Sequence, residues 1–402
     1  MKKMAPRGTM IASCASFFAL GLVTAALGPA LPDLAANTGS SLATVGGVIT
    51  ALFLGALIAL SVAGPLNDRL GQRPVLIVGV VLLALGMLGI ATSHWLPLTF
   101  LCAVVAGLGH GAIDISTNVL IAEVFVGRSA AALNLLNVFF GLGAVAGPAI
   151  AGLTLRLWNT ALPALWIGAA LTLLQAPLIP LLADAPRAPH AEAGKSRAAS
   201  LFRTPLLWAL GVLVLIYVGV ENGIGSWTTA YLASTTRLDH ATAALAASGF
   251  WLALTGGRVI AALIGTRLTP DRLLLIALIG AFGGGVLLVS SVGNAPLTIA
   301  AVLCMGLCFG PVFPTTLAIT TATFRQAPGT AASAVVAMGS FGGMLLPWLQ
   351  GVLLERVSPA ASVLLVAAGA LGMLALHIGR GELTKRRPAT DDQQPRTIDI
   401  AS

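Results

Sequence analysis

Long apolar runs separated by short polar turns dominate the chain. Two of them, Pro74 to Ser93 and Leu273 to Ser291, contain no charged residue. A helix needs about 20 apolar residues to cross the hydrocarbon core of a bilayer, whereas the strands of a membrane barrel are shorter and alternate between apolar and polar positions. The pattern therefore predicts an all-α membrane protein made of transmembrane helices.

The apolar runs fall into two sets of six, with one long polar stretch between them. The predicted spans are 9–31, 43–66, 74–93, 97–125, 129–155 and 161–183, then 205–232, 241–266, 272–292, 295–324, 329–354 and 358–379. We therefore expect two six-helix halves, 1–183 and 205–379. A polar linker over 184–204 joins them, and a polar tail follows over 380–402.

Composition agrees with a lipid environment. Of the 402 residues, 57% are hydrophobic and only 9% are charged, against roughly 25% charged in a soluble domain. The net charge of +8 does not indicate nucleic acid binding, because the basic residues lie at the ends and in short loops. If the N-terminus is cytoplasmic, 19 of the 22 lysines and arginines fall on or near that side, the exceptions being Arg156, Arg237 and Arg356. This bias predicts a multi-pass protein of the bacterial inner-membrane type with both termini cytoplasmic.

The two halves carry a trace of duplication. Span four reads GLGHG from Gly107, and span ten reads GLCFG from Gly306. Gly107 corresponds to Gly306 and Gly111 to Gly310, with the same separation along the sequence in both pairs. Two related six-helix halves around a site near the bilayer midplane are a common plan of secondary transporters.

The loop between spans two and three reads GPLNDRLGQRPVL, from Gly64 to Leu76. It resembles the signature loop of the major facilitator superfamily, which implies that fold. Asp68, Arg69 and Arg73 are expected at the cytoplasmic interface, where Asp68 docks on the other half as a salt-bridge latch. The alternative is an ordinary charged loop that only sets topology.

Three further positions bear on this cytoplasmic gate. Gln72 stands where the superfamily usually has a basic residue, so one contact of the loop is expected to be missing. Glu123 and Arg128 bracket the cytoplasmic end of span four and are expected to join the same ionic cluster.

Two carboxylates lie deep in predicted spans, Asp114 in span four and Glu221 in span seven. A charge at the centre of a membrane helix costs about 2.5–3.5 kcal/mol on insertion scales, so such residues usually face a cavity, a partner or a functional site. We interpret both as proton-coupling groups. His110 and Asn118 share the helix face of Asp114, and His110 is expected to tune or relay the proton. The alternative is a buried neutral acid that hydrogen-bonds a neighbouring helix.

The remaining polar candidates are predicted to bind substrate. Asn118, Asn137 and Asn222 offer amides inside spans, and Trp227 is either a stacking surface for a sugar ring or an interfacial residue. The glycines between Asn222 and Trp227 are expected to loosen span seven around the substrate.

The segments GLGHGAIDISTNV, YVGVENGIGSW and GGRV together resemble the fucose permease branch of that superfamily. This resemblance implies sugar–proton symport. A second coupling aspartate of that branch has no counterpart, because Gly28 stands at the matching position. The run Gly143, Gly147, Pro148 and Gly152 instead resembles a motif of drug–proton antiporters, although glycines at this spacing also pack helices.

The leading hypothesis is therefore a proton-coupled symporter for a small polar, sugar-like solute. The alternatives are a proton-coupled antiporter that exports lipophilic compounds and, as a third hypothesis, a non-transporting membrane sensor. An enzyme is not expected, because no Walker loop, HExxH or nucleophile elbow occurs. We expect no cofactor, no metal and no nucleic acid partner. The predicted partners are a small-molecule substrate, protons and the lipid bilayer, and we expect a monomer.

Overall fold

The computed structural model describes residues 6–125, 128–181, 201–265, 267–325 and 327–385. The N-terminal half contains α1 (Pro6–Thr38), α2 (Leu42–Leu70), α3 (Gln72–Thr92), α4 (Leu96–Val124), α5 (Ser129–Trp158), α6 (Leu162–Leu174) and the 3₁₀ helix η1 (Ala176–Leu181). The C-terminal half contains α8 (Pro205–Thr235), α9 (His240–Ile264), α10 (Pro270–Ser290), α11 (Ala295–Phe309), α12 (Val312–Thr323), α13 (Pro328–Arg356) and α14 (Pro359–Lys385). Most of the predicted linker and tail lies outside the described residues.

Within the described residues, twelve helical spans are long and apolar enough to cross a membrane, which confirms the predicted all-α class. The predicted spans differ from the helices mainly at their ends. Predicted span ten is divided into α11 and α12 at Gly310 and Pro311. Proline lacks the backbone N–H that continues a helix, so two prolines, Pro311 and Pro314, weaken the ladder at this point.

The two halves pack their helices alike. A methyl group at Gly107 or Gly111 of α4 would collide with the backbone of α2. A methyl group at Gly306 of α11, or at Gly310 just after α11, would collide with the backbone of α9. In each half, therefore, small residues of the fourth span allow close contact with the second span. This shared packing supports the duplication inferred from the sequence.

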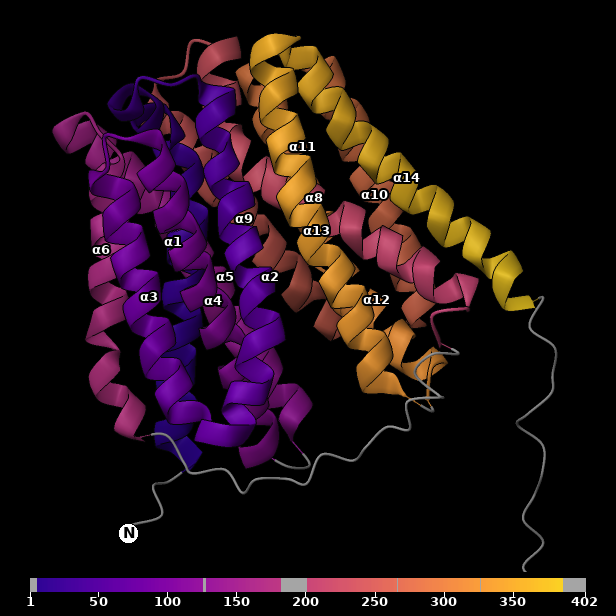
Figure 1. Cartoon of the computed structure of the whole chain (residues 1–402). Coiled ribbons are helices and arrows are strands. Elements are labelled where there is room, and N and C mark those ends of the chain that lie inside the picture. The colour runs from indigo at the N-terminus through magenta and orange to yellow at the C-terminus, as the bar shows by residue number, and fades with distance from the viewer. Residues whose placement is uncertain (1–5, 126–127, 182–200, 266, 326, 386–402) are drawn as a thin grey trace, which may run out of the picture.

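We call the end of the bundle where α1 begins the N-terminal face and the other end the distal face. Figure 1 shows the ribbons of the two halves converging at the distal face and diverging toward the N-terminal face. The hydrogen bonds between the halves that involve described residues lie from the middle of the spans toward the distal face. The Thr50 hydroxyl donates to the Met344 carbonyl at 2.8 Å, and the Ser248 hydroxyl donates to the Val145 carbonyl at 2.7 Å.

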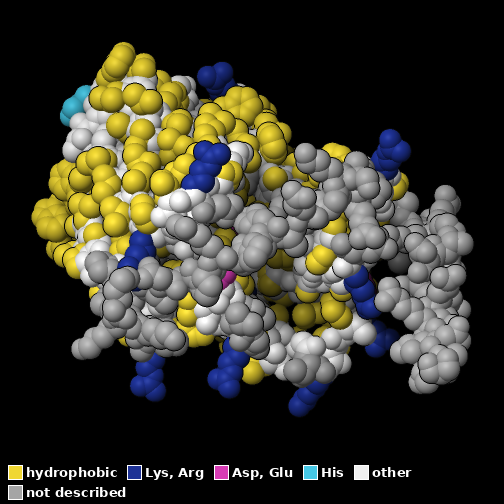
Figure 2. Space-filling model, turned by 60° about the horizontal axis from the view of Figure 1, so that its bottom comes forward, with side chains coloured by type: hydrophobic (Ala, Val, Ile, Leu, Met, Phe, Trp, Pro, Cys, Tyr) yellow, Lys and Arg dark blue, Asp and Glu magenta, His cyan; other side chains and the backbone are white. Residues whose placement is uncertain are grey.

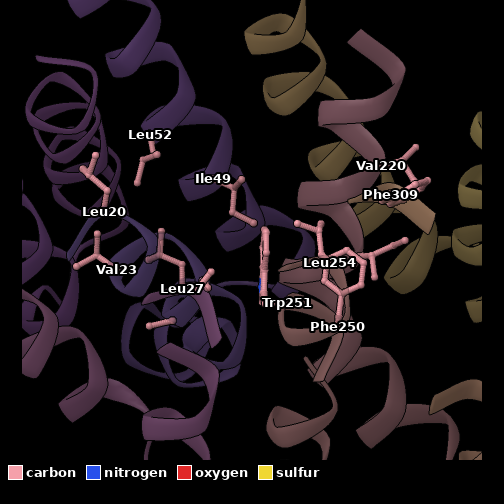
Figure 3. Packing of buried hydrophobic residues seen from close by; sticks show 14 of the residues in the cluster. Leu20, Val23, Leu27, Ile49, Leu52, Val220, Phe250, Trp251, Leu254 and Phe309 are labelled. Atoms are coloured by element: carbon pink, nitrogen blue, oxygen red, sulfur yellow. The ribbon is translucent and has the colours of Figure 1, made fainter. Parts of the chain in front are cut away.

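Apolar packing accompanies these hydrogen bonds. Leu27 of α1, Ile49 of α2 and Leu254 of α9 are all buried and belong to one hydrophobic cluster with Trp251. Figure 3 shows Ile49 and Leu254 on either side of the Trp251 ring. Burial on this scale excludes water from the middle of the junction between the halves.

Trp227 of α8 closes the junction at the distal end. Its side chain is 0% exposed, and its indole N–H donates to the Pro347 carbonyl at 2.7 Å. The ring fits between Gly46 of α2 and Gly351 of α13, where an added methyl group would lie 2.6 Å and 2.1 Å from ring atoms. Glycine is therefore required at both positions for the halves to meet here.

Replacing Gly46 by alanine is expected to force the halves apart at the distal face, because the new methyl group collides with a ring that is fixed by its hydrogen bond. Spin labels on Ala36→Cys and Arg237→Cys in a cysteine-free background report this separation. We expect the population with long distances to rise. Gly283→Ala is the control, because a methyl group there meets no atom within 4 Å. An unchanged distance distribution in Gly46→Ala would contradict the role of this contact.

Candidate functional site

The centre of the C-terminal half holds a buried ion pair. Glu221 lies halfway along α8, and its Oε1 is 3.6 Å from Nη2 of Arg258 on α9. The side chains are only 10% and 20% exposed, respectively. Charges removed from water are tolerated when they are paired, because each compensates the desolvation cost of the other. The pair therefore fixes one ionic contact between α8 and α9 within the membrane.

Tyr217 completes this group of side chains. It lies one helical turn before Glu221, is fully buried, and places its phenol oxygen beside both charged groups. Its ring stacks on Phe313, with centroids 6.3 Å apart, and meets the edge of Phe309 at 5.6 Å. Since Phe309 and Phe313 flank the break between α11 and α12, that break positions two aromatic rings against Tyr217.

Arg258 and Tyr217 were not among the residues predicted for the site. The sequence signal for Arg258 is the same as for Glu221, namely a charged residue within an otherwise apolar span. The segment GGRV entered the sequence analysis only as part of the resemblance to the fucose permease branch, so Arg258 was not considered as a site residue.

Asp114 forms a second centre, in the N-terminal half. The Asn118 amide donates to Oδ1 of Asp114 at 2.9 Å and to its backbone carbonyl at 3.0 Å. Asp114, Asn118 and His110 are all half-buried on α4. The predicted cluster of polar groups on one face of span four is thus present, and its carboxylate is held by a neutral donor rather than by a cation.

The other predicted substrate residues have local partners. The Asn137 amide donates to the Leu133 carbonyl at 3.0 Å, and the Asn222 amide donates to the Val218 carbonyl at 2.8 Å. Trp227 lies in the slot described above. The expected loosening of span seven is absent from this conformation, because α8 is continuous from Pro205 to Thr235.

Trp251 is a further candidate that the sequence analysis missed. It is buried on α9, yet its indole N–H has no hydrogen-bond partner among the described residues. Figure 3 shows it between Ile49 of the N-terminal half and Leu254 of its own half. A tryptophan with an unused donor where the two halves meet is suited to contact a transported solute.

The predicted gate residues lie at the N-terminal face. Gln72 donates from Nε2 to Oε2 of Glu123 at 3.0 Å, so the glutamine replaces a contact that was expected to be lost. Arg69 and Arg128 are exposed, and Arg73 is half-buried. The side chain of Asp68 is outside the described part of the structure, so its latch role stays a prediction. A methyl group at Gly64 would meet no atom within 4 Å, so this glycine makes no close helix contact in this conformation.

The run in span five packs α5 against other helices. Methyl groups at Gly143 and Gly147 would collide with the backbone of α1, and one at Gly152 would lie 3.0 Å from the Ala241 carbonyl oxygen of α9. Helix packing therefore accounts for these glycines without a drug-antiporter function.

Several proteins of similar sequence are named as transporters. Sodium-dependent glucose transporter 1 of Danio rerio is 27% identical over 400 residues, which cover 86% of this chain and 64% of that protein. Sodium-dependent glucose transporter 1A of Mus musculus is 25% identical over 380 residues, covering 84% of this chain and 88% of that protein. The chain thus spans less than two thirds of the zebrafish relative and most of the mouse one.

Solved structures share the fold. A D-xylose–proton symporter superposes with a TM-score of 0.77 at 15% identity, covering 91% of this chain and 97% of that one. The fucose–proton symporter of E. coli superposes with a TM-score of 0.64 at 18% identity, covering 92% and 98%. The family model described as Major Facilitator Superfamily matches residues 13–347 and, in a second match, 224–398. Twelve spans, two similarly packed halves and these matches establish that the chain belongs to the major facilitator superfamily of transporters.

Proposed function

We propose that this protein is a proton-coupled symporter that carries a small polar, sugar-like solute by alternating access. The observation that carries the proposal is the group formed by Glu221, Arg258 and Tyr217. It supplies hydrogen-bond donors and acceptors halfway across the membrane, close to buried aromatic rings, which are the features needed to bind a hydroxylated ring. The relatives named as sugar transporters support the same substrate class.

Asp114 is proposed as the coupling group. It lies in the half opposite the Glu221–Arg258 pair, and its partner Asn118 is neutral, so it can gain or lose a proton without breaking an ion pair. His110, one turn away, is proposed to assist the transfer. Sodium is the competing coupling ion, because two relatives are named as sodium-dependent transporters.

We propose that the N-terminal face is cytoplasmic. The positive-inside bias of the sequence supports this orientation, and Figure 2 shows lysine and arginine side chains spread around that face. Because the halves meet toward the distal face, the described conformation then corresponds to an inward-facing carrier. In the outward-facing state, the loop with Asp68, Arg69 and Arg73 is proposed to close the cytoplasmic side.

A contact at the distal face favours the opposite conformational state, in which the cytoplasmic side is open. Glu355, at the end of α13, accepts a hydrogen bond from the backbone N–H of Ala43 in the first turn of α2. A carboxylate at a helix N-terminus satisfies an unpaired N–H and interacts favourably with the helix dipole. Since α2 and α13 belong to different halves, the contact stabilises only the state in which the distal face is closed.

Replacing Glu355 by alanine is expected to shift the equilibrium toward the outward-facing state. Loss of an exposed cap of this kind costs about 1 kcal/mol, which corresponds to roughly a five-fold change in the ratio of states. The spin-label pair at Ala36 and Arg237 measures the change.

Asp33→Ala is the matched control. Asp33 accepts hydrogen bonds from the Ala161 N–H and the Thr160 hydroxyl at 2.6 and 3.0 Å, so it caps α6 within one half. This variant is expected to lower stability while the ratio of the two states stays constant. Equal shifts in both variants would show that the Glu355 contact is not specific to distal closure.

The proposed transport activity is tested with purified protein in liposomes that contain a pH-sensitive dye. Monosaccharides are added outside without an imposed gradient, first in sodium-free buffer and then with sodium. Acidification of the lumen by a sugar in sodium-free buffer is the expected result. Sugar uptake that requires sodium and leaves the luminal pH constant would overturn proton coupling.

The same liposomes test the alternative, a proton-coupled antiporter for lipophilic compounds. Lipophilic cations replace the sugars in a second series. Proton movement with the cations and none with any sugar would favour export of lipophilic compounds over the proposed symport.

A further inference from the structure

An apolar groove lies between α1, α5 and α6, away from the ion pair of the C-terminal half. Its volume is about 590 Å³, within the roughly 300–1,000 Å³ range of small-ligand sites. Its lining includes Ile11, Phe18, Phe139 and Leu174. Ile11 and Leu174 are 62% and 69% exposed, so the groove opens on an apolar outer surface of a membrane-spanning protein.

Gln175 is the polar exception in this lining. It follows the last residue of α6, is 4% exposed, and has no hydrogen-bond partner for Oε1 or Nε2 among the described residues. Buried amides are almost always hydrogen-bonded, because the unmet bond is costly in an apolar medium. A single water is a poor partner here, since a buried water needs two to four polar neighbours. The amide therefore indicates a ligand that brings its own acceptor.

Arg7 lies on α1 one helical turn before Ile11 of the groove lining. Arg7, Ile11, Cys14 and Phe18 follow one another at intervals of three or four residues, so they lie along one face of α1. Arg7 is exposed and is the member of this row closest to the N-terminal face. From that face inward, the site thus offers a cation, then an amide, then hydrocarbon and aromatic side chains.

This order matches the order of groups in a phospholipid. Gln175 lies four residues before the end of the apolar span Leu162–Ile179, and Arg7 is the first residue of the span Arg7–Thr38. The ends of a span are where the hydrocarbon core gives way to the polar headgroup region of the bilayer. Basic side chains beside membrane helices attract lipid phosphates. A purely lipophilic compound has neither a phosphate to bind Arg7 nor a carbonyl to accept from the Gln175 amide.

We propose that the groove between α1, α5 and α6 binds one membrane phospholipid, with an acyl chain between Phe18 and Phe139, an ester carbonyl on the Gln175 amide and the phosphate on Arg7. The site is independent of the transported solute.

The first experiment uses photoactivatable acyl probes in nanodiscs. Phosphatidylglycerol and diacylglycerol, each with a diazirine in the acyl chain, are compared, and labelled peptides of α1 and α6 are quantified. We expect phosphatidylglycerol to label these peptides several-fold more than diacylglycerol. Gln175→Leu is expected to reduce labelling by both probes, whereas Arg7→Gln removes only the preference for the phosphate. Arg267→Gln, at an exposed arginine of the C-terminal half, is the control and keeps the wild-type pattern.

The second experiment separates binding from a structural role of Gln175. In lipid-free detergent, Gln175→Leu is expected to have a melting temperature equal to or above that of the wild type, because an unpartnered amide has been removed. Added phosphatidylglycerol is expected to raise the melting temperature of the wild type and leave that of the variant unchanged.

Two outcomes would overturn the proposal. One is equal labelling of α1 and α6 in wild type and Gln175→Leu. The other is displacement of the label by tetraphenylphosphonium but not by unlabelled phosphatidylglycerol, which would assign the groove to lipophilic cations.

Discussion

Replacing Arg258 by methionine is expected to abolish solute uptake and to lower the free energy of unfolding. Methionine is unbranched, like the methylene chain of arginine, but it carries no charge. The Glu221 carboxylate is therefore left buried without its cation. Breaking a buried ion pair on one side costs about 3–5 kcal/mol. If solute binding uses the same guanidinium, uptake falls by about two orders of magnitude or more, since each 1.4 kcal/mol corresponds to a factor of ten. Uptake into proteoliposomes and thermal unfolding in detergent measure the two effects.

A double variant distinguishes structure from function at this pair. Glu221→Gln combined with Arg258→Met leaves no uncompensated charge, so most of the lost stability is expected to return while uptake stays absent. Arg267→Met, at an exposed position beyond α9, is the control and is expected to transport normally. Wild-type uptake by Arg258→Met would remove the pair from the proposed site.

Replacing Asp114 by asparagine is expected to abolish proton-driven accumulation while solute exchange continues. The amide cannot carry a proton across the membrane, but its oxygen still accepts the hydrogen bond from Asn118, so folding is retained. Accumulation under an imposed pH gradient is compared with exchange of labelled for unlabelled solute in the same liposomes.

Asp33→Asn is the control for this effect. Asp33 lies near the distal end of α1 and is held by residues 160 and 161, so it is expected to have no part in coupling. Normal accumulation by Asp114→Asn would refute the coupling role. Loss of exchange together with accumulation would instead assign Asp114 to solute binding.

Some features of the candidate site were predictable because they depend on one helix alone. Asp114 and Asn118 share a face through the helical repeat, and their hydrogen bond follows from that spacing. The sequence shows Gln72 at a position that is usually basic. It does not show that Gln72 bonds to Glu123, because that contact joins the start of α3 to the end of α4. The function of Trp227 was left open for the same reason, since its slot combines glycines from α2 and α13.

The sequence by itself determined the twelve spans, the two halves and the superfamily, because apolar length and a short loop motif are local properties that the bilayer thickness turns into structure. Only the tertiary structure decided that Glu221 pairs with Arg258, that Glu355 caps α2, and that Gln175 lies in an apolar groove without a hydrogen-bond partner in the described part of the chain. Each of these depends on how helices rotate and approach one another. In lipid, that is set by the packing of small residues and by polar contacts between helices, which a hydrophobic pattern along one chain does not contain.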